Sequence, residues 1–311
     1  MIDFRQIIST TNRYNFHSHT QFCDGRDVME NFVIAAINSG FKHLGFTPHS
    51  PIPFHSPCNI ADERVEEYFD EFNRLKQKYG DRIALYRSFE IDYLNEWGPA
   101  NDYFKNLDLD YRIGSVHFIP SFVNDNEFID IDGSPEAFKV KMNDYFYNDI
   151  EGVVISFYTQ TLKMIEAGHF DIIGHFDKIG YNASCFKPGI EDEKWYVDLV
   201  KETFDAIMDC HYWIEINTKG ASIIPKGFTR FENINFNCSV PLADTAFVTV
   251  SSDSVTLTIP VSEIDTAQKE NGCKPLYFYG DGGVFFTNNI SIDSEGKNNM
   301  NVQLSGIIFL K

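Results

Sequence analysis

The feature that most constrains the fold of this chain is a repeated alternation of short apolar runs with longer amphipathic stretches over residues 1–220. Residues 26–40 and 61–80 place apolar side chains at helical spacing, and each stretch ends in a glycine, a common helix stop. Residues 134–168 and 191–210 are also predicted to be helical. Short β-rich runs separate and follow these stretches, at 42–50, 82–93, 111–119, 170–179 and 212–220. This alternation predicts parallel βα units, in either a barrel or a doubly wound sheet.

Polar side chains at the ends of the predicted strands favour the barrel. A barrel builds its active site from the carboxyl ends of many strands, which meet on one face. We therefore predict an α/β fold with a TIM-like barrel. The strand-end residues with side chains suited to such a site are His17, His19, His49, Glu90, Asp92, His117, His175, Asp177, Glu215 and Asn217.

The sequence changes character after about residue 221. No convincing amphipathic helix follows, and Asn, Ser and Thr alternate with β-forming residues between glycine and asparagine turn signals. This composition is typical of antiparallel β structure. We predict a barrel domain over residues 1–235, with 246–253 as a candidate for its last strand, and a β-rich segment of unknown role over 236–311.

Composition and charge limit the classes of partner. The net charge of −19 and the pI near 4.8 argue against nucleic acid, whose phosphates favour a basic face. A small anionic substrate stays possible, because bound divalent cations can supply local positive charge. No run approaches the roughly 20 apolar residues that span a bilayer, and the first ten residues have no apolar signal core. The six cysteines have no paired spacing, so we expect free thiols and a cytoplasmic location without membrane contact.

His17 and His19 form the first candidate metal-binding pair. Residues two apart on a strand point to the same face, so both imidazoles could reach one ion. An HxH pair alone is weak evidence, because most such pairs bind no metal. The pair gains weight from four more strand-end residues, namely His49, Glu90, His117 and His175. Burying this many polar groups without partners is costly, and metal coordination would offset the cost, with Glu90 suited to bridge two cations.

Six segments in this order resemble the successive motifs of the PHP (polymerase and histidinol phosphatase) superfamily, and most closely its histidinol-phosphatase branch. The resemblance covers about residues 12–220. The segments are "FHSHTQFCDG", "GFTPHSPIPF", "FEIDY", "IGSVHFI", "IIGHFDKI" and "EINTKG". The resemblance implies a distorted (β/α)7 barrel with two or three divalent metal ions (Zn, Mn or Fe). It also implies a hydrolase of histidine biosynthesis, a phosphatase that converts L-histidinol phosphate to L-histidinol and phosphate.

Carried over residue by residue, the resemblance assigns ligands to three ions. His17, His19 and Glu90 would bind the first ion. Glu90 would bridge to a second ion. That ion would also be bound by His117 and His175, and a third would be bound by His49 and Asp24. No catalytic group is expected beyond a metal-activated water.

The sequence departs from the family pattern at its last motif, an Asp-x-His. The best-placed candidate is Asp253, but Val255 occupies the position of the histidine, and no histidine follows His211. Either Asp253 supplies one ligand, or the barrel is incomplete. One alternative hypothesis is a degenerate PHP domain that binds metal or ligand without turnover. The other is a PHP phosphoesterase with a different small substrate, or a nuclease. The acidic charge argues against the nuclease.

Other candidate residues have plainer interpretations. Asp92 and Glu215 fit structural hydrogen bonds as well as catalysis, and Asp177 fits a role in orienting His175. Cys23 is interpreted as an inert thiol. The residues assigned to packing or to the solvated surface are His43, His55, His169, His211, Arg112, Lys178 and Lys219.

Overall fold

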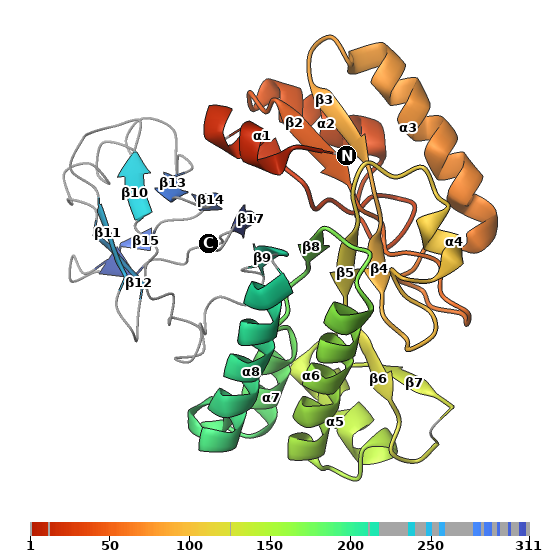
Figure 1. Cartoon of the computed structure of the whole chain (residues 1–311), viewed down its shortest axis with the longest axis vertical. Coiled ribbons are helices and arrows are strands. Elements are labelled where there is room, and N and C mark those ends of the chain that lie inside the picture. The colour runs from red at the N-terminus through yellow and green to blue at the C-terminus, as the bar shows by residue number, and fades with distance from the viewer. Residues whose placement is uncertain are drawn as a thin grey trace. The chain divides into compact units, whose positions relative to one another are not determined.

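The computed structural model describes residues 2–11, 13–124, 126–210 and 212–217, together with eight short strands beyond them. The chain divides into two compact units, Met1–Phe176 and Asp177–Lys311, which are taken separately below. Figure 1 shows the elements with their labels. None of the described helices is both long and apolar enough to cross a membrane.

Two parallel sheets form the centre of the first unit, as the alternating pattern predicts. One has the strand order β1-β2-β3 and the other contains β4, β5 and β8, with β5 in the middle. Their bounds are β1 (Tyr14–Asn15), β2 (His43–Phe46), β3 (Ala84–Arg87), β4 (Glu90–Asp92), β5 (Ile113–Ser115) and β8 (Ile172–Ile173). A parallel bridge between His49 and Glu90 joins the two sheets. This bridge places His49, three residues after the end of β2, beside the first residue of β4.

The remaining elements of the first unit are helices and one hairpin. Their bounds are α1 (Phe4–Thr10), α2 (Met29–Asn38), the 3-10 turn Asp62–Arg64, α3 (Val65–Tyr79), α4 (Asp102–Lys105), β6 (Phe118–Pro120), β7 (Phe128–Asp130), α5 (Pro135–Tyr145) and α6 (Ile150–Ala167). β6 and β7 pair antiparallel. The parallel sheets with their connecting helices make this an α/β fold.

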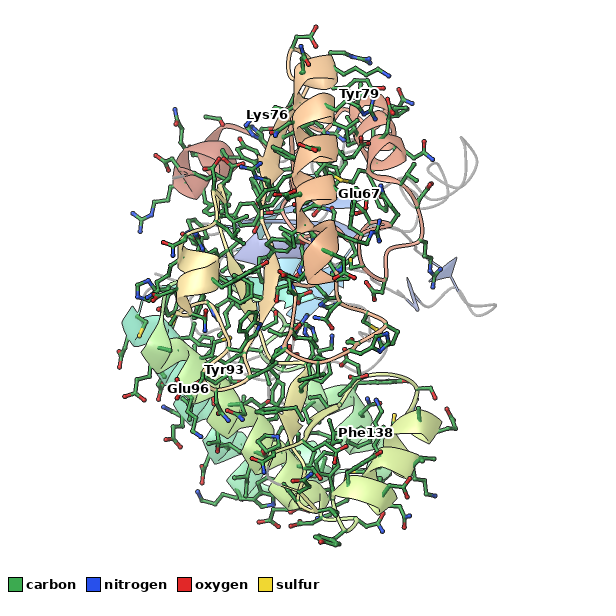
Figure 2. All side chains as sticks on the ribbon, turned by 90° about the vertical axis from the view of Figure 1, so that its right-hand side faces the viewer. Glu67, Lys76, Tyr79, Tyr93, Glu96 and Phe138 are labelled. Carbon is green, nitrogen blue, oxygen red and sulfur yellow. The ribbon has the colours of Figure 1, made fainter. Side chains whose placement is uncertain are left out.

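Helix α3 shows how the local sequence produces packing. Its buried residues recur at three- and four-residue intervals and give one apolar stripe, whereas Glu67 and Lys76 lie on other faces. Figure 2 shows α3 from outside, with Glu67, Lys76 and Tyr79 labelled along it. From the buried stripe, the hydroxyl of Tyr68 donates to the carbonyls of Phe46 and Ser88 at 3.1 and 2.9 Å. Tyr68 therefore ties together the two chain segments that lead into His49 and Glu90.

The predicted helical stretch 134–168 is two helices, α5 and α6. Tyr147 and Asn148 between them have positive φ values of 53° and 59°, which an α-helix does not allow. Each new helix also has its own N-cap: Ser134 accepts from the backbone N–H of Ala137, and Asp149 accepts from that of Gly152. The predicted strand 82–93 is likewise divided into β3 and β4, which belong to different sheets.

The second unit begins with helices and continues into short strands. Its helices are α7 (Ile179–Phe186), the 3-10 turn Ile190–Asp192 and α8 (Lys194–Cys210), followed by β9 (Trp213–Asn217). Its later strands are β10 (Phe236–Ser239), β11 (Phe247–Val250), β12 (Val255–Thr258), β13 (Leu276–Gly280), β14 (Gly283–Thr287), β15 (Ser291–Ile292), β16 (Asn298–Asn299) and β17 (Ser305–Ile308). Among these later strands the described pairings are antiparallel. The division at residue 235 stays a prediction.

Candidate metal centre

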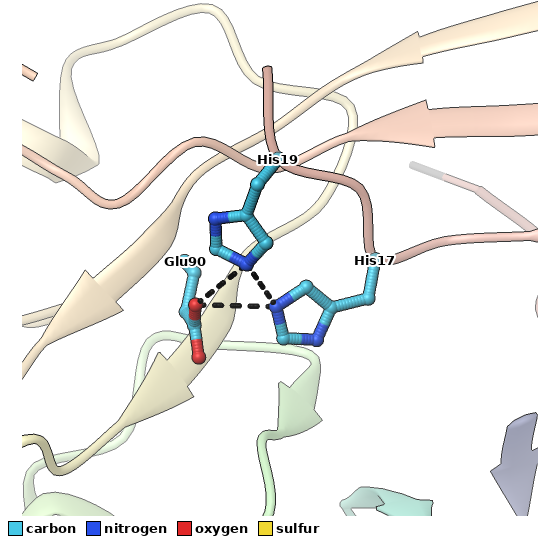
Figure 3. Close-up of side chains that lie close together, drawn as sticks. All are labelled: His17, His19 and Glu90. Carbon is cyan, nitrogen blue, oxygen red and sulfur yellow. Dashed lines mark hydrogen bonds and ion pairs between the residues drawn. The ribbon is translucent and has the colours of Figure 1, made fainter. Parts of the chain in front are cut away.

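The strand ends of the first unit bring the predicted histidines to one place. His17 and His19 follow β1, His49 follows β2, His117 follows β5, and His175 follows β8. Their ring nitrogens form overlapping groups with carboxylate oxygens of Glu90 at the start of β4, of Asp24 and of Asp92. In each group the possible ligand atoms lie within 4.8 Å of one another. Figure 3 shows three of these side chains, His17, His19 and Glu90, pointing toward one another. The five predicted histidines and Glu90 therefore lie close together in the structure.

Glu90 lies at the centre of this cluster, with its side chain 1% exposed. Nitrogens of His17, His19 and His49 approach its Oε2 at 3.1, 3.3 and 3.3 Å. On the other side, Nε2 of His175 and Nε2 of His117 approach its Oε1 at 2.8 and 3.3 Å. One buried carboxylate therefore faces five imidazoles, three through one oxygen and two through the other. We call Glu90 and these five histidines the inner cluster.

The spacing of the nitrogens fits a bound cation. His17 Nε2 lies 3.0 Å from His19 Nε2, and His117 Nε2 lies 3.2 Å from His175 Nε2. Each contact can hold at most one hydrogen bond, whereas two nitrogens bound to one tetrahedral ion at about 2.0–2.1 Å lie about 3.3 Å apart. Oε2 of Glu90 is buried and has no hydrogen-bond partner in the described protein, although three nitrogens surround it. The inner cluster could therefore hold metal ions.

Asp24 lies at the exposed edge of the inner cluster. Its Oδ1 is 3.3 Å from His19 Nδ1 and 3.9 Å from His49 Nε2, and its side chain is 41% exposed. These three side chains form a further group of ligand type. Cys23, which sequence reasoning set aside, places its Sγ 3.4 Å from the same His19 nitrogen. The sequence feature that could have marked Cys23 as a candidate is its position beside Asp24, in the turn that follows His17 and His19.

Ser115 is a contributor that sequence reasoning missed. Its hydroxyl donates to Glu90 Oε1 at 2.7 Å and is buried. Gly174 leaves the room for this hydroxyl, because a Cβ at that position would lie 2.3 Å from Ser115 Oγ. The available signal was spacing: Ser115 precedes His117 by two residues, which on an extended chain is the same face.

Burial and neighbouring charge act in opposite directions on Glu90 and His19. Burial favours the neutral form of Glu90, but the imidazoles of His17, His117 and His49 outweigh it and hold the pKa of Glu90 well below its ordinary value. Burial also opposes protonation of His19, yet its contacts with Cys23 and Glu90 raise the pKa of that ring to about 9. In the metal-free protein, His19 therefore carries a proton at neutral pH, which a metal ion must displace.

Other candidate residues have different surroundings or are outside the described residues. Arg112 donates through Nη2 to the carbonyls of Phe104 and Leu107, so its guanidinium is engaged with the backbone. In the second unit, burial and the charge of Glu215 raise the pKa of Asp177 to about 6. His43 Nδ1 lies 2.7 Å from the Tyr86 hydroxyl, in packing. The predicted residues that fall outside the description are His211, Lys219 and Asp253.

The α/β fold and the cluster of histidines around Glu90 define a class of protein. Comparison with known families identifies this class. The chain belongs to the PHP domain family, whose model matches residues 15–219, and the resemblance found in the sequence is confirmed. It is 32% identical over 178 residues to "Probable histidinol-phosphatase" of Schizosaccharomyces pombe, covering 52% of this chain and 55% of that relative. It is 28% identical over 170 residues to a protein of the same name from Deinococcus radiodurans, covering 52% and 59%. The matches thus span little more than half the length of these curated relatives.

A solved structure supports the fold. The crystal structure of a Listeria monocytogenes protein assigned to the histidinol phosphatases superposes with a TM-score of 0.57 and 21% identity. The superposition covers 65% of this chain and 80% of that one. At this level of identity, the likeness concerns the fold alone.

Proposed function

We propose that this protein is a metal-dependent phosphomonoesterase that hydrolyses L-histidinol phosphate to L-histidinol and phosphate. The observation that carries the proposal is the buried carboxylate of Glu90 with three imidazoles on one oxygen and two on the other. The relatives named histidinol-phosphatase support the choice of substrate. The family match also supports closure of the parallel strands into a distorted (β/α)7 barrel.

Five residues of the inner cluster form two ligand sets that share Glu90. His17 and His19 face Oε2, and would hold one divalent ion (Zn, Mn or Fe) with it. His117 and His175 face Oε1 and would hold a second. His49 and Asp24 would hold a third. Asp253 is proposed as an additional ligand from the later part of the chain.

When bound, the divalent ions supply positive charge that polarises the phosphate oxygens, eases deprotonation of the attacking water and offsets the charge of the leaving alkoxide. The chain's own contribution is placement. Glu90 stays ionised because of its imidazole neighbours, so it offers both oxygens as acceptors. Ser115 holds Oε1 in position by its hydrogen bond. The inner cluster, Glu90 and five histidines, contains no lysine or arginine, so phosphate binding is expected to depend on the loaded metal.

The test combines metal counting with phosphate release. The purified chain is analysed for bound metal, and phosphate release from L-histidinol phosphate is measured with and without added Mn²⁺ or Zn²⁺. The proposal expects stoichiometric metal and metal-dependent release that is faster from L-histidinol phosphate than from other phosphomonoesters. Stoichiometric metal without release from any of these phosphomonoesters would contradict it.

A matched pair of variants links activity to the inner cluster. His17→Ala removes a ring that faces Glu90, and we expect metal and activity to be lost together. His43→Ala removes a ring that packs on Tyr86 instead, and metal and activity should stay at the wild-type level. Retention of both properties in His17→Ala would refute its assignment as a ligand.

One sequence observation favours a second candidate function, a PHP domain that binds metal or ligand without turnover. Val255 stands where the family has a histidine, and the chain has no histidine after His211. This candidate expects full metal loading and no release from any phosphomonoester. Release from another small phosphate ester at a higher rate would instead identify a PHP phosphoesterase with a different substrate.

A further inference from the structure

The carboxylate of Asp92, which the ligand sets proposed above do not use, contacts the inner cluster. Asp92 stands two residues after Glu90 on β4, and its side chain is 1% exposed. Its Oδ1 is 2.6 Å from His117 Nδ1, on the side of the ring away from Glu90. Its Oδ2 accepts a hydrogen bond from Asn59 Nδ2 at 2.7 Å. Each oxygen of Asp92 therefore has a partner within the protein.

We infer that Asp92 is a positioning residue that fixes the orientation and the proton of His117, so that Nε2 of this ring presents its lone pair to a metal ion. The inference rests on the proposed function only in requiring that the inner cluster binds metal. Asp92 also forms a group of ligand type with His49 and His117. Its 2.6 Å contact with His117 Nδ1 is nevertheless a hydrogen-bond distance, shorter than the about 3.3 Å between two ligand atoms on one tetrahedral ion, so we assign Asp92 to the support of a ligand.

The proton on His117 follows from what a carboxylate can do. An ionised carboxylate accepts hydrogen bonds and donates none, so the short contact with Asp92 places a proton on His117 Nδ1. In the neutral ring the other nitrogen then has no proton. That nitrogen, Nε2, lies 3.2 Å from His175 Nε2 and 3.3 Å from Glu90 Oε1. A carboxylate in this relation raises the basicity of a metal-binding imidazole and holds its ring in place.

Asn59 determines which Asp92 oxygen must accept a hydrogen bond. Its Nδ2 donates both to Asp92 Oδ2 and to the carbonyl of Ser50, at 2.7 and 2.8 Å, which identifies this atom as the amide nitrogen. The Asp92 oxygen that faces Asn59 must therefore be an acceptor. An amide at position 92 cannot satisfy both neighbours while the proton of His117 stays on Nδ1. Its NH₂ would face the NH₂ of Asn59, or it would donate to His117 Nδ1 and drive the ring proton to Nε2.

This conflict makes Asp92→Asn a sharp test, since it changes hydrogen bonding but hardly changes size. The measurement is Zn²⁺ affinity by competition with a chromophoric chelator, alongside thermal unfolding of the metal-free protein. We expect wild type to bind Zn²⁺, Asp92→Asn to bind about 10- to 100-fold more weakly, and the metal-free unfolding temperature to change little. The matched control is Asp110→Asn, whose carboxylate accepts from the backbone N–H of Arg87 and touches no histidine in the described contacts. Its Zn²⁺ affinity should equal that of wild type.

Two further measurements decide the inference if Asp92→Asn does not fold. Asn59→Ala removes the partner of Oδ2 from a loop, and it should weaken Zn²⁺ binding relative to wild type. Nitrogen-15 NMR of histidine-labelled, metal-free wild type, assigned with His117→Gln, should show the His117 proton on Nδ1. A ring with its only proton on Nε2, or Zn²⁺ affinity in Asp92→Asn equal to wild type, would overturn the inference. Absence of Zn²⁺ binding in wild type would instead refute the proposed metal centre, and the NMR result would still decide the role of Asp92.

Discussion

Two groups of charged side chains in the first unit each surround a glutamate, but they differ in burial and in the partners of that glutamate. The outer group lies on α2 and α3, where Glu30 contacts Arg74, Lys78 and the Tyr79 hydroxyl, each at 2.7 Å. Arg74 also pairs with Glu71 on the same helix. Every charge in this group faces an opposite charge, and the side chains of Arg74 and Lys78 are about half exposed.

The inner cluster differs from the outer group in its burial and in the kind of side chain that surrounds the carboxylate. Glu90 is buried, and the groups around it are imidazoles whose nitrogens converge on one another as well as on the carboxylate. Exposed ion pairs need no further partner, because water screens what the side chains leave unbalanced. Buried lone pairs that converge have no such screening and need a cation. The difference shows that burial together with converging acceptors, and not the number of charges, marks the candidate functional site.

The largest expected effect comes from the centre of the inner cluster. Glu90→Gln keeps the size of the side chain but removes its charge, so both ligand sets should lose metal. We expect metal affinity and phosphatase activity to fall by about 100-fold or more, beyond the loss typical of a supporting residue. The measurements are metal content and phosphate release. Glu71→Gln in the outer group is the control, and wild-type metal content in Glu90→Gln would remove the distinction between the two groups.

Proton competition gives the next largest effect. The pKa of His19 is raised to about 9 in the metal-free protein, so below that pH a metal ion must displace its proton. Apparent metal affinity should rise by up to about tenfold per pH unit toward pH 9 and then level off. Because the folded pKa exceeds the ordinary value of 6.5, the stability this proton adds to the metal-free protein is complete below pH 6.5. That stability is lost as the pH rises through 9. Chelator competition between pH 6 and 10 checks the affinity, and a flat profile would contradict this prediction.

Metal removal should lower the free energy of unfolding only where the inner cluster is intact. An ion that binds only the folded state at 100 times its Kd adds about 2.7 kcal/mol to the free energy of unfolding. Excess chelator should therefore lower the stability of wild type but leave Glu90→Gln unchanged. Urea unfolding with and without chelator measures this. Equal destabilisation of both proteins would show that the chelator acts elsewhere.

The smallest effect is expected in the outer group. Contacts with Lys78, Tyr79 and Arg74 lower the pKa of Glu30 to about 2, so Glu30 stabilises the fold above its ordinary pKa, and this contribution is lost as the pH falls toward 2. Glu30→Gln should lower the urea midpoint slightly at low salt and less at high salt, because salt screens exposed pairs. Metal content should not change. A loss of metal in Glu30→Gln would show that the two groups are coupled.

The strand ends were predictable because parallel strands align their carboxyl ends, which brought His17, His49, His117 and His175 together. Glu90 was predicted at such an end but lies at the start of β4, because the predicted strand 82–93 is divided into β3 and β4. The break between α5 and α6 was not predictable, since apolar spacing continues across it and only the positive φ values at Tyr147 and Asn148 reveal the turn. Ser115 was missed because a buried hydroxyl has no distinctive pattern until its acceptor is known. Cys23 was interpreted as an inert thiol because its contact with His19 Nδ1 depends on the turn that follows His19.

The sequence by itself determined which residue types arrive at the strand ends, and hence the family and the kind of chemistry. Only the tertiary structure decided which atoms meet. It assigned Oε2 of Glu90 to three rings and Oε1 to two, and it turned Nδ1 of His117 toward Asp92. The physical reason is that strand periodicity sets the face from which a side chain leaves the backbone. The direction of a ring or carboxylate instead depends on hydrogen-bond partners far away in the chain, such as Asn59 for Asp92.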